Sequence, residues 1–287
     1  MVEQVRKVAV LGTGTIGAPV ARNLRGRFAV NAWNRTPSRA LALAADGVEV
    51  FDDPAAAVGG ADVVVTVLKD GAAVREAMEA AAPGLADGAV WVQISTVGAE
   101  AVEGLAEFAD RHGLVFYDAP VLGTKQPAEK GLLTVLAAGP DGGARGAADA
   151  VFDAIGARTV WVAETPGAAS RLKLALNSYV FALTHGTAEA LSLARALGVD
   201  PALVVDAITG GPLDSGYFQG KSAAVLAGEY EPSFTVDNAA KDARLVVEAA
   251  RAAGVHADLA EAGLRRFERA GERGHGGKDM AASYLAE

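Results

Sequence analysis

The chain has 287 residues, 51% of them hydrophobic, and a formal net charge of −9, so it can bury the core of one or two domains. Its acidity and its lack of cysteine argue against a broad nucleic-acid-binding surface, disulfides and cysteine-based zinc sites. No uncharged apolar run reaches membrane-spanning length, and the first residues lead into a predicted strand without a signal peptide, so we expect a cytoplasmic protein.

The first predicted strand, residues 8–11, leads into a G-x-G-x-x-G turn at the start of an alanine-rich helical segment. In this setting the first glycine permits the turn, the second lets the backbone approach a pyrophosphate, and the third lets the helix pack on the strand. The unpaired N–H groups and the positive end of the helix dipole hold the phosphates. We therefore predict a dinucleotide site formed by Gly12, Thr13, Gly14, Thr15, Ile16 and Gly17.

The end of the second predicted strand, residues 29–33, indicates which dinucleotide binds. A carboxylate at this position would bind the ribose 2′-OH of NAD and repel the 2′-phosphate of NADP. Residues 34–39 contain no acid but do contain Arg35, Arg39 and two hydroxyl side chains. Because guanidinium groups suit bidentate phosphate recognition, we predict NADP. The alternative is that Arg35 only stacks on the adenine and that NAD binds as well.

Further apolar runs occur at residues 61–68, 89–94 and 114–117, and shorter ones at 132–136 and 159–162 are candidates to extend the same sheet. Helical segments separate the longer runs, which favours right-handed βαβ units and a mostly parallel sheet buried on both faces. We predict an α/β fold class, with a Rossmann-type doubly wound sheet that binds NADP over residues 1–165.

The pattern changes in the second half. From Ala168 to about Leu197 there is no proline and one glycine, which predicts a single helix of roughly 45 Å. It is apolar almost all round, so we expect it to be buried on several sides, between domains or subunits. Helical patterns continue at residues 237–253 and 257–270. We therefore predict an all-α C-terminal domain over residues 166–287 that binds substrate and mediates dimerisation.

Two polar residues interrupt this long apolar helix. Lys173 and Asn177 are four residues apart and share one face. Lys173 is either a snorkelling surface residue or a functional ammonium whose pKa is lowered by burial, which would suit it for proton transfer. Lys241 and Asp242, further along, form a pair that by itself is typical of a solvated helix face.

Ligands in open α/β sheets bind at the carboxyl ends of the strands, and two polar segments follow predicted strands there. One contains Ser95 and Thr96, and the other is residues 118–124, which read Asp-Ala-Pro-Val-Leu-Gly-Thr. The four histidines are scattered without a metal-binding spacing, so we predict no metal site.

Tyr217 and Lys221 reproduce the Y-x-x-x-K pair of the short-chain dehydrogenases. They follow a Gly-Gly-Pro segment and enclose Gly220, so we do not expect the sheet-flanking helix that this chemistry requires. The N-terminal turn also differs from the T-G-x-x-x-G-x-G of that family, so we discard this interpretation.

In this order, the segments described above resemble the β-hydroxyacid dehydrogenases. That family includes 3-hydroxyisobutyrate dehydrogenase, tartronate semialdehyde reductase and glyoxylate/succinic semialdehyde reductase, and it is related to 6-phosphogluconate dehydrogenase. The resemblance covers nearly the whole chain. It implies a nicotinamide cofactor, a small β-hydroxyacid or semialdehyde as substrate, and a homodimer or homotetramer. The matching segments are residues 11–17, 34–37, 95–97, 118–121, 167–177, 241–242 and 274–279, and residues 125–131 look closest to the glyoxylate reductase branch.

The resemblance also implies a role for each matching residue. Lys173 would be the general acid/base on the substrate hydroxyl, and Asn177 would orient the substrate or Lys173. Thr96 would line the nicotinamide pocket, and Lys241 would contact the nicotinamide end of the cofactor. Leu122, Gly123 and Thr124 would form the substrate-carboxylate site. The implied cofactor contacts are Gly12, Thr13, Gly14, Thr15, Ile16, Gly17, Asn34, Arg35, Thr36, Val67, Leu68, Thr96 and Lys241.

One position departs from the family pattern. The family usually has serine where this chain has Leu122, so an isobutyl group replaces a hydroxyl donor, and Thr124 is the candidate to supply the lost hydroxyl. This departure keeps an imine reductase open as an alternative, although imine reductases usually carry aspartate or tyrosine at the position of Lys173. A non-catalytic NADPH-binding sensor is the third interpretation, and the presence of both Lys173 and Asn177 argues against it.

Overall fold

The structure is a computed structural model that describes residues 5–286. The expectation about the N-terminus also involves residues 1–4, which lie outside the described residues. The chain forms two compact units, Met1–Lys173 and Leu174–Glu287. None of the helices in the described part combines the length and the apolarity that crossing a membrane requires.

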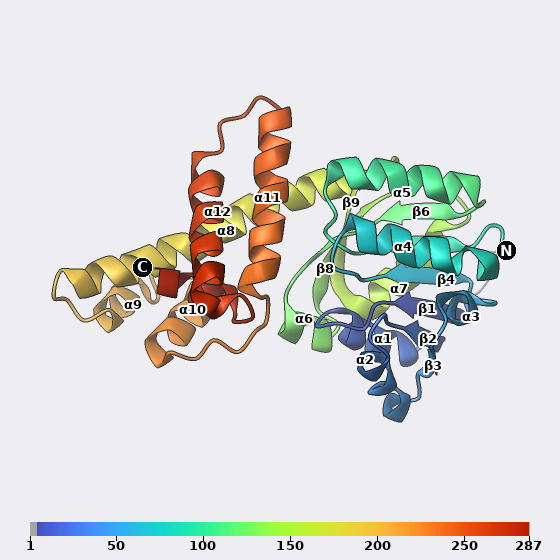
Figure 1. Cartoon of the computed structure of the whole chain (residues 1–287), viewed down its shortest axis with the longest axis horizontal. Coiled ribbons are helices and arrows are strands. Elements are labelled where there is room, and N and C mark those ends of the chain that lie inside the picture. The colour runs from blue at the N-terminus through green and yellow to red at the C-terminus, as the bar shows by residue number, and fades with distance from the viewer. Residues whose placement is uncertain (1–4, 287) are drawn as a thin grey trace. The chain divides into compact units, whose positions relative to one another are not determined.

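The first unit contains one sheet, in which the described strands follow the order β3-β2-β1-β4-β5-β6-β8-β7, with β9 paired to β8 (Figure 1). Strands β1 to β6 are parallel, and their order 3-2-1-4-5-6 is that of a dinucleotide-binding doubly wound fold. The strands are β1 (Lys7–Leu11), β2 (Ala29–Trp33), β3 (Glu49–Phe51), β4 (Val63–Thr66), β5 (Val90–Gln93), β6 (Val115–Asp118), β7 (Val121–Leu122), β8 (Leu133–Ala138) and β9 (Gly156–Ala163).

Alternation along the strands divides the core of this unit into two layers. On β1, Val8 and Val10 face α1 and α7, whereas Ala9 and Leu11 face α3, α4 and α5. Both faces are covered, which explains why the parallel strands are almost continuously apolar. The helices of this unit are α1 (Gly17–Arg25), α2 (Pro37–Leu41), α3 (Pro54–Val58), α4 (Gly71–Ala81), α5 (Ala99–Arg111), α6 (Lys125–Glu129) and α7 (Arg145–Ile155), with short 3₁₀ turns η1 (Ala44–Asp46) and η2 (Ala82–Gly84).

Helix α8 (Ala168–Ala196) confirms the predicted long helix, and it begins in the first unit. Within this chain its buried positions recur every three or four residues, as at Leu174, Asn177, Phe181 and Ala188, so the chain itself buries one face of α8 rather than several. The second unit continues with helices α9 (Ala202–Ile208), α10 (Gly216–Ala227), α11 (Val236–Ala252) and α12 (Asp258–Ala270), a π-helical turn η3 (Gly271–His275) and the 3₁₀ helix η4 (Met280–Ala286).

Several elements were not predicted, among them β3, β7 and α10. Strands β3 and β7 have three and two residues, too few to show a period of two. Helix α10 was not predicted because Gly220 interrupts its pattern. The apolar runs at 132–136 and 159–162 do join the sheet as β8 and β9, and β8 runs antiparallel to β6 and β7.

Candidate functional site

The glycine turn lies at the carboxyl end of β1, next to β4, where the strand order of the sheet reverses. Gly12 has φ +104°, and a Cβ on it would overlap the carbonyl oxygen of Val67. A Cβ on Gly17 would overlap the carbonyl oxygen of Gly12, whereas a Cβ on Gly14 would meet no atom within 4 Å. Gly12 and Gly17 are therefore required because a side chain would overlap the backbone of the turn. Gly14 leaves open space where a pyrophosphate would approach.

A hydrogen-bond chain connects this turn to the loop after β2. The backbone N–H of Thr13 donates to Oδ1 of Asn34 at 3.0 Å, and Nδ2 of Asn34 donates to the carbonyl oxygen of Thr36 at 3.0 Å. The hydroxyl of Thr13 is buried and has no hydrogen-bond partner among the described residues. Because an unsatisfied buried hydroxyl is costly, this donor fits a group that the chain itself does not supply, such as a phosphate oxygen.

The loop after β2 presents charge to solvent. The side chains of Arg35, Thr36, Ser38 and Arg39 are exposed, and Pro37 begins α2. No acidic side chain occurs in residues 34–39. The residues present therefore fit a nicotinamide dinucleotide with its adenosine end at this loop.

The ends of the next strands complete this edge of the sheet. After β4, the N–H of Val67 donates to the carbonyl of Leu11 at 2.9 Å, and the N–H of Leu68 donates to the hydroxyl of Ser95 at 2.8 Å. Thr96 follows Ser95 and is partly exposed. The predicted cofactor residues of this unit thus belong to adjacent parallel strands or to the turns that follow them.

The predicted substrate loop follows β7. Leu122 is half-buried at the end of the strand, and Gly123 has φ +123°. A Cβ on Gly123 would lie 2.7 Å from Leu133 and 3.0 Å from Pro127, so glycine is required here by both backbone and packing. Thr124 precedes α6, and its side chain makes no capping hydrogen bond to that helix.

Lys173 and Asn177 lie one turn apart on α8, and Lys173 is partly buried. Asn177 is 4% exposed, and its Nδ2 donates to Oδ2 of Asp242 at 3.0 Å. The Lys241 ammonium forms an ion pair with Asp242, at 2.6 Å from its Oδ1. Asp242 therefore holds both Asn177 and Lys241.

This geometry overturns the interpretation of Lys241 and Asp242 as a solvated helix face, because Asp242 is only 2% exposed. Asp242 is not among the functional residues predicted from the sequence. A signal was present: Asp242 lies three residues after Ala239 and four before Val246, in the buried stripe of α11. A carboxylate in an apolar helix stripe predicts a buried partner, since an unpaired buried charge is strongly unfavourable.

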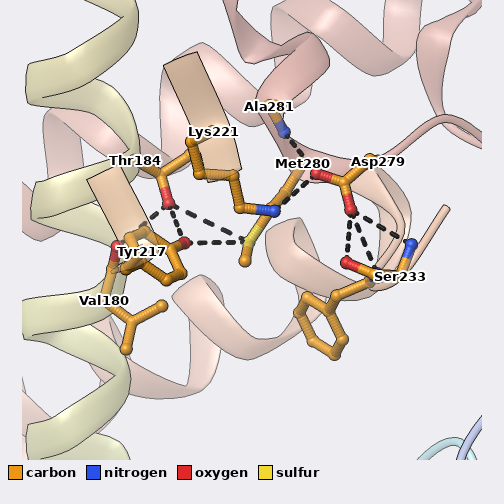
Figure 2. A network of polar contacts seen from close by, with 9 residues as sticks. Val180, Thr184, Tyr217, Lys221, Ser233, Asp279, Met280 and Ala281 are labelled. Carbon is orange, nitrogen blue, oxygen red and sulfur yellow. Dashed lines mark hydrogen bonds and ion pairs between the residues drawn. The ribbon is translucent and has the colours of Figure 1, made fainter. Parts of the chain in front are cut away.

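Tyr217 and Lys221 lie on α10, in the helical unit, where they belong to the polar network of Figure 2. The Tyr217 and Thr184 hydroxyls are 2.6 Å apart, and the Lys221 ammonium is 2.6 Å from Oδ1 of Asp279. The pair lies on a helix of the second unit, whereas the sheet belongs to the first. Both side chains are occupied in joining α10 to α8 and to the C-terminal segment, which agrees with discarding the short-chain dehydrogenase interpretation.

Asp279 is the centre of this network. Besides Lys221, its carboxylate accepts hydrogen bonds from the backbone N–H groups of Ser233, Phe234 and Ala281 and from the Ser233 hydroxyl. Burial alone would raise the pKa of Asp279, but Lys221 and these hydrogen bonds outweigh burial, so its pKa lies below the usual value. Asp279 thereby fixes the segment before α11, the helix that carries Lys241 and Asp242.

Two family models together match almost the whole chain. Residues 7–163 match the NAD-binding domain of 6-phosphogluconate dehydrogenase, and residues 167–286 match the NAD-binding domain of NADP-dependent 3-hydroxyisobutyrate dehydrogenase. The fold and these matches define an NAD(P)-dependent oxidoreductase that acts on CH–OH groups. The chain belongs to the β-hydroxyacid dehydrogenase family.

Individual relatives agree with this assignment. The chain is 29% identical to the uncharacterised oxidoreductase YfjR of Bacillus subtilis, covering 96% of this chain and 98% of that one. It is 28% identical to glyoxylate/succinic semialdehyde reductase 1 of Arabidopsis thaliana, covering 96% of each. The crystal structure of 3-hydroxyisobutyrate dehydrogenase from Salmonella typhimurium superposes with a TM-score of 0.90 at 27% identity, covering 98% of this chain and all of that one.

Two further relatives bear on the alternatives to a hydroxyacid dehydrogenase, a non-catalytic protein and an imine reductase. The human cytokine-like nuclear factor N-PAC is 28% identical over 98% of this chain, but the chain spans only about half of its length. An imine reductase from a Pseudomonas species, at 22% identity, 99% coverage of each chain and a TM-score of 0.63, shares the fold.

Proposed function

We propose that this enzyme uses NADP(H) to transfer hydride between the nicotinamide and a small β-hydroxyacid or (semi)aldehyde, with Lys173 as the general acid/base. The observation that carries the proposal is the buried arrangement one turn beyond Lys173, in which Asp242 accepts a hydrogen bond from Asn177 and pairs with Lys241. Burying a carboxylate between an amide and an ammonium is costly unless all three are held in one geometry. Such rigid polar groups are typical of reaction sites.

Each residue has a defined part in this proposal. The cofactor supplies hydride chemistry at its nicotinamide ring when it is bound. In the reductive direction the Lys173 ammonium gives its proton to the oxygen of the substrate carbonyl, and in the oxidative direction neutral Lys173 removes the hydroxyl proton. Asn177, fixed by Asp242, orients the substrate oxygen or the Lys173 amine. Lys241 contacts the nicotinamide end of the cofactor, and Thr96 lines its pocket.

The preference for NADP is supported by the loop after β2, where Arg35 and Arg39 are exposed and no acid is present. An anion at this loop meets guanidinium and hydroxyl donors instead of a repelling carboxylate. The unpaired hydroxyl of Thr13 and the open space beside Gly14 support the pyrophosphate position.

The substrate end is less polar than the family pattern. Leu122 offers no hydrogen bond to a carboxylate, so the backbone N–H groups around Gly123 and the Thr124 hydroxyl are the donors we assign to it. The names of relatives suggest glyoxylate, succinic semialdehyde and 3-hydroxyisobutyrate as the first compounds to test. Leu122 is also the observation that favours the second candidate, a reductase of cyclic imines.

Substitution of Lys173 tests the proposal. Lys173→Ala should lower kcat for aldehyde reduction by about 10²–10⁴, the usual contribution of a general acid. NADPH affinity, measured by fluorescence titration, should change little. The charge-matched variant Lys173→Arg should not restore kcat, because a guanidinium does not release its proton at working pH.

Three outcomes would contradict parts of the proposal. Turnover close to wild type in Lys173→Ala would exclude this lysine as the proton donor. Faster turnover of cyclic imines than of aldehydes would favour the imine reductase. Tight NADPH binding without oxidation by any aldehyde, semialdehyde or imine would favour a sensor.

A further inference from the structure

A buried carboxylate, that of Asp118, lies at the end of β6. Asp118 is fully buried, and its oxygens accept three hydrogen bonds from residues about fifty positions later in the sequence. Oδ2 accepts from the backbone N–H groups of Gly167 at 3.0 Å and Ser170 at 2.8 Å, and Oδ1 accepts from the Ser170 hydroxyl at 2.7 Å. Ser170 belongs to the first turn of α8, and Gly167 directly precedes that helix.

These contacts make Asp118 the N-terminal cap of α8, supplied from a different element. The first N–H groups of a helix have no partner within the helix, and a carboxylate also interacts favourably with the positive end of the helix dipole. Burial raises the pKa of Asp118, while the hydrogen bonds from Ser170 and Gly167 and the charge of Arg171 oppose that rise by favouring the ionised form. Gly167, at φ +94°, lets the chain turn so that its N–H reaches Asp118.

The capped turn is the one that immediately precedes Lys173. Ser170 and Lys173 are three residues apart, about 4.5 Å along the helix axis. Two backbone bonds and one side-chain bond to a single buried carboxylate fix both the axial position and the rotation of this turn on the end of β6. A small displacement of a catalytic group is expensive in rate, on the order of 10²-fold for 1 Å.

We propose that Asp118 is a positioning residue for the reaction, acting through Ser170 to place Lys173. This inference rests on the proposed function, in which Lys173 transfers the proton. Asp118 itself does not touch substrate in this assignment. Its carboxylate acts on the helix, and the helix carries the lysine.

A purely structural role predicts something different. In that case removal of the contacts would lower the thermal midpoint but leave the turnover of each folded molecule unchanged. A positioning role lowers kcat in fully folded enzyme, while NADPH binding at the glycine turn is retained. The effects of Asp118 and Ser170 on kcat must also be non-additive, because one residue acts through the other.

The experiment compares Asp118→Asn, Ser170→Ala and the double variant with wild type, each assayed with NADPH and with glyoxylate or succinic semialdehyde. Ser170→Ala removes only one hydroxyl and is the variant of choice if Asp118→Asn does not fold. Tyr117→Phe is the matched control, since it removes one hydrogen bond, to the carbonyl of Pro140, from the neighbouring residue of the same strand. Circular dichroism measures how much of each variant is folded, and NADPH titration measures the concentration of molecules that bind the cofactor.

We expect kcat to fall at least tenfold in Asp118→Asn and Ser170→Ala, with the dissociation constant of NADPH within twofold of wild type. The double variant should lose no more than about the larger single loss, and Tyr117→Phe should keep kcat within twofold. Normal kcat in folded Ser170→Ala and Asp118→Asn, additive losses, or an equal loss in Tyr117→Phe would each overturn the inference.

Lys173→Ala, measured in the same assay, separates this inference from the proposed function. If Lys173→Ala is inactive and the Asp118 and Ser170 variants are normal, only the positioning role of Asp118 is wrong. If Lys173→Ala retains wild-type turnover, the proposed proton donor is wrong, and the positioning role fails with it.

Discussion

At the residue scale, the loop after β2 is where we propose that the chain distinguishes NADP from NAD. Asn34 is fixed to the glycine turn through Thr13, so the next residue, Arg35, begins at a defined place next to the turn. Its side chain is exposed and can rotate onto a 2′-phosphate without losing a buried contact. The electrostatic contribution of Arg35 should therefore appear only when the cofactor carries that phosphate.

Arg35→Ala should raise the Michaelis constant for NADPH by roughly 10- to 100-fold, as expected for the loss of a charged hydrogen bond. The Michaelis constant for NADH should change by less than about threefold. Arg27→Ala, which also removes one exposed positive charge from the same unit, is the control and should affect neither. Equal effects of Arg35→Ala on both cofactors, or tighter binding of NADH by the wild type, would contradict NADP preference.

At the element scale, the packing of α8 on α12 contains a titratable group without a partner. The ring of His185 on α8 lies 4.3 Å from that of Phe267 and against Gly263, where a Cβ would come within 2.7 Å of the imidazole. Neither ring nitrogen has a hydrogen-bond partner among the described residues. Burial, and then the charges of Arg266 and Arg269, lower the pKa of His185 to about 4.

This pKa makes the stability of the helical unit depend on pH. His185 has an unfolded pKa of 6.5, so between pH 6.5 and 4 the unfolded chain binds a proton that the folded chain does not. The free energy of unfolding should therefore fall as the pH falls through this range, by about 2 kcal/mol at pH 5. Urea unfolding at pH 7.5 and pH 5 measures the loss.

His185→Leu should remove that part of the pH dependence, while replacement of the exposed His256 by leucine should leave it intact. An unchanged difference between the two pH values in His185→Leu would show that other groups cause it.

At the scale of the whole molecule, one chain does not cover its own apolar surface. Tyr179 and Leu193 on α8 are 64% and 58% exposed, and Leu197, directly after α8, is 71% exposed. Scattered exposed apolar residues are ordinary, but these lie on or directly after a long helix whose apolar sequence predicts burial on several sides. A second copy of the chain is the partner that we propose for this surface.

Light scattering at micromolar concentration should therefore give the mass of a dimer or tetramer of the 29.1 kDa chain. Leu193→Glu should shift the mass toward the monomer, because it buries a charge in the proposed interface. Leu41→Glu, at a similarly exposed leucine of the first unit, is the control and should not change the mass. A monomeric wild type would exclude this assembly.

Local sequence patterns determined much of this protein. The strand–turn–helix at Gly12, the apolar runs that form the seven strands other than β3 and β7, and the uninterrupted helix from Ala168 were all predictable, because period, turn chemistry and glycine geometry act over a few residues. The candidate pair Lys173 and Asn177 followed from helix spacing, and their catalytic roles followed only from the family resemblance.

Tertiary structure alone decided which polar groups meet. Asn177 and Asp242 are 65 residues apart, Asp118 and Ser170 are 52 apart, and Lys221 and Asp279 are 58 apart. No local pattern encodes such pairs, because in the sequence each of these acidic residues looks the same as a solvent-exposed one. Only the fold removes water from around its carboxylate. Burial then makes a partner obligatory, and the packing of α8, α10 and α11 determines which partner is available.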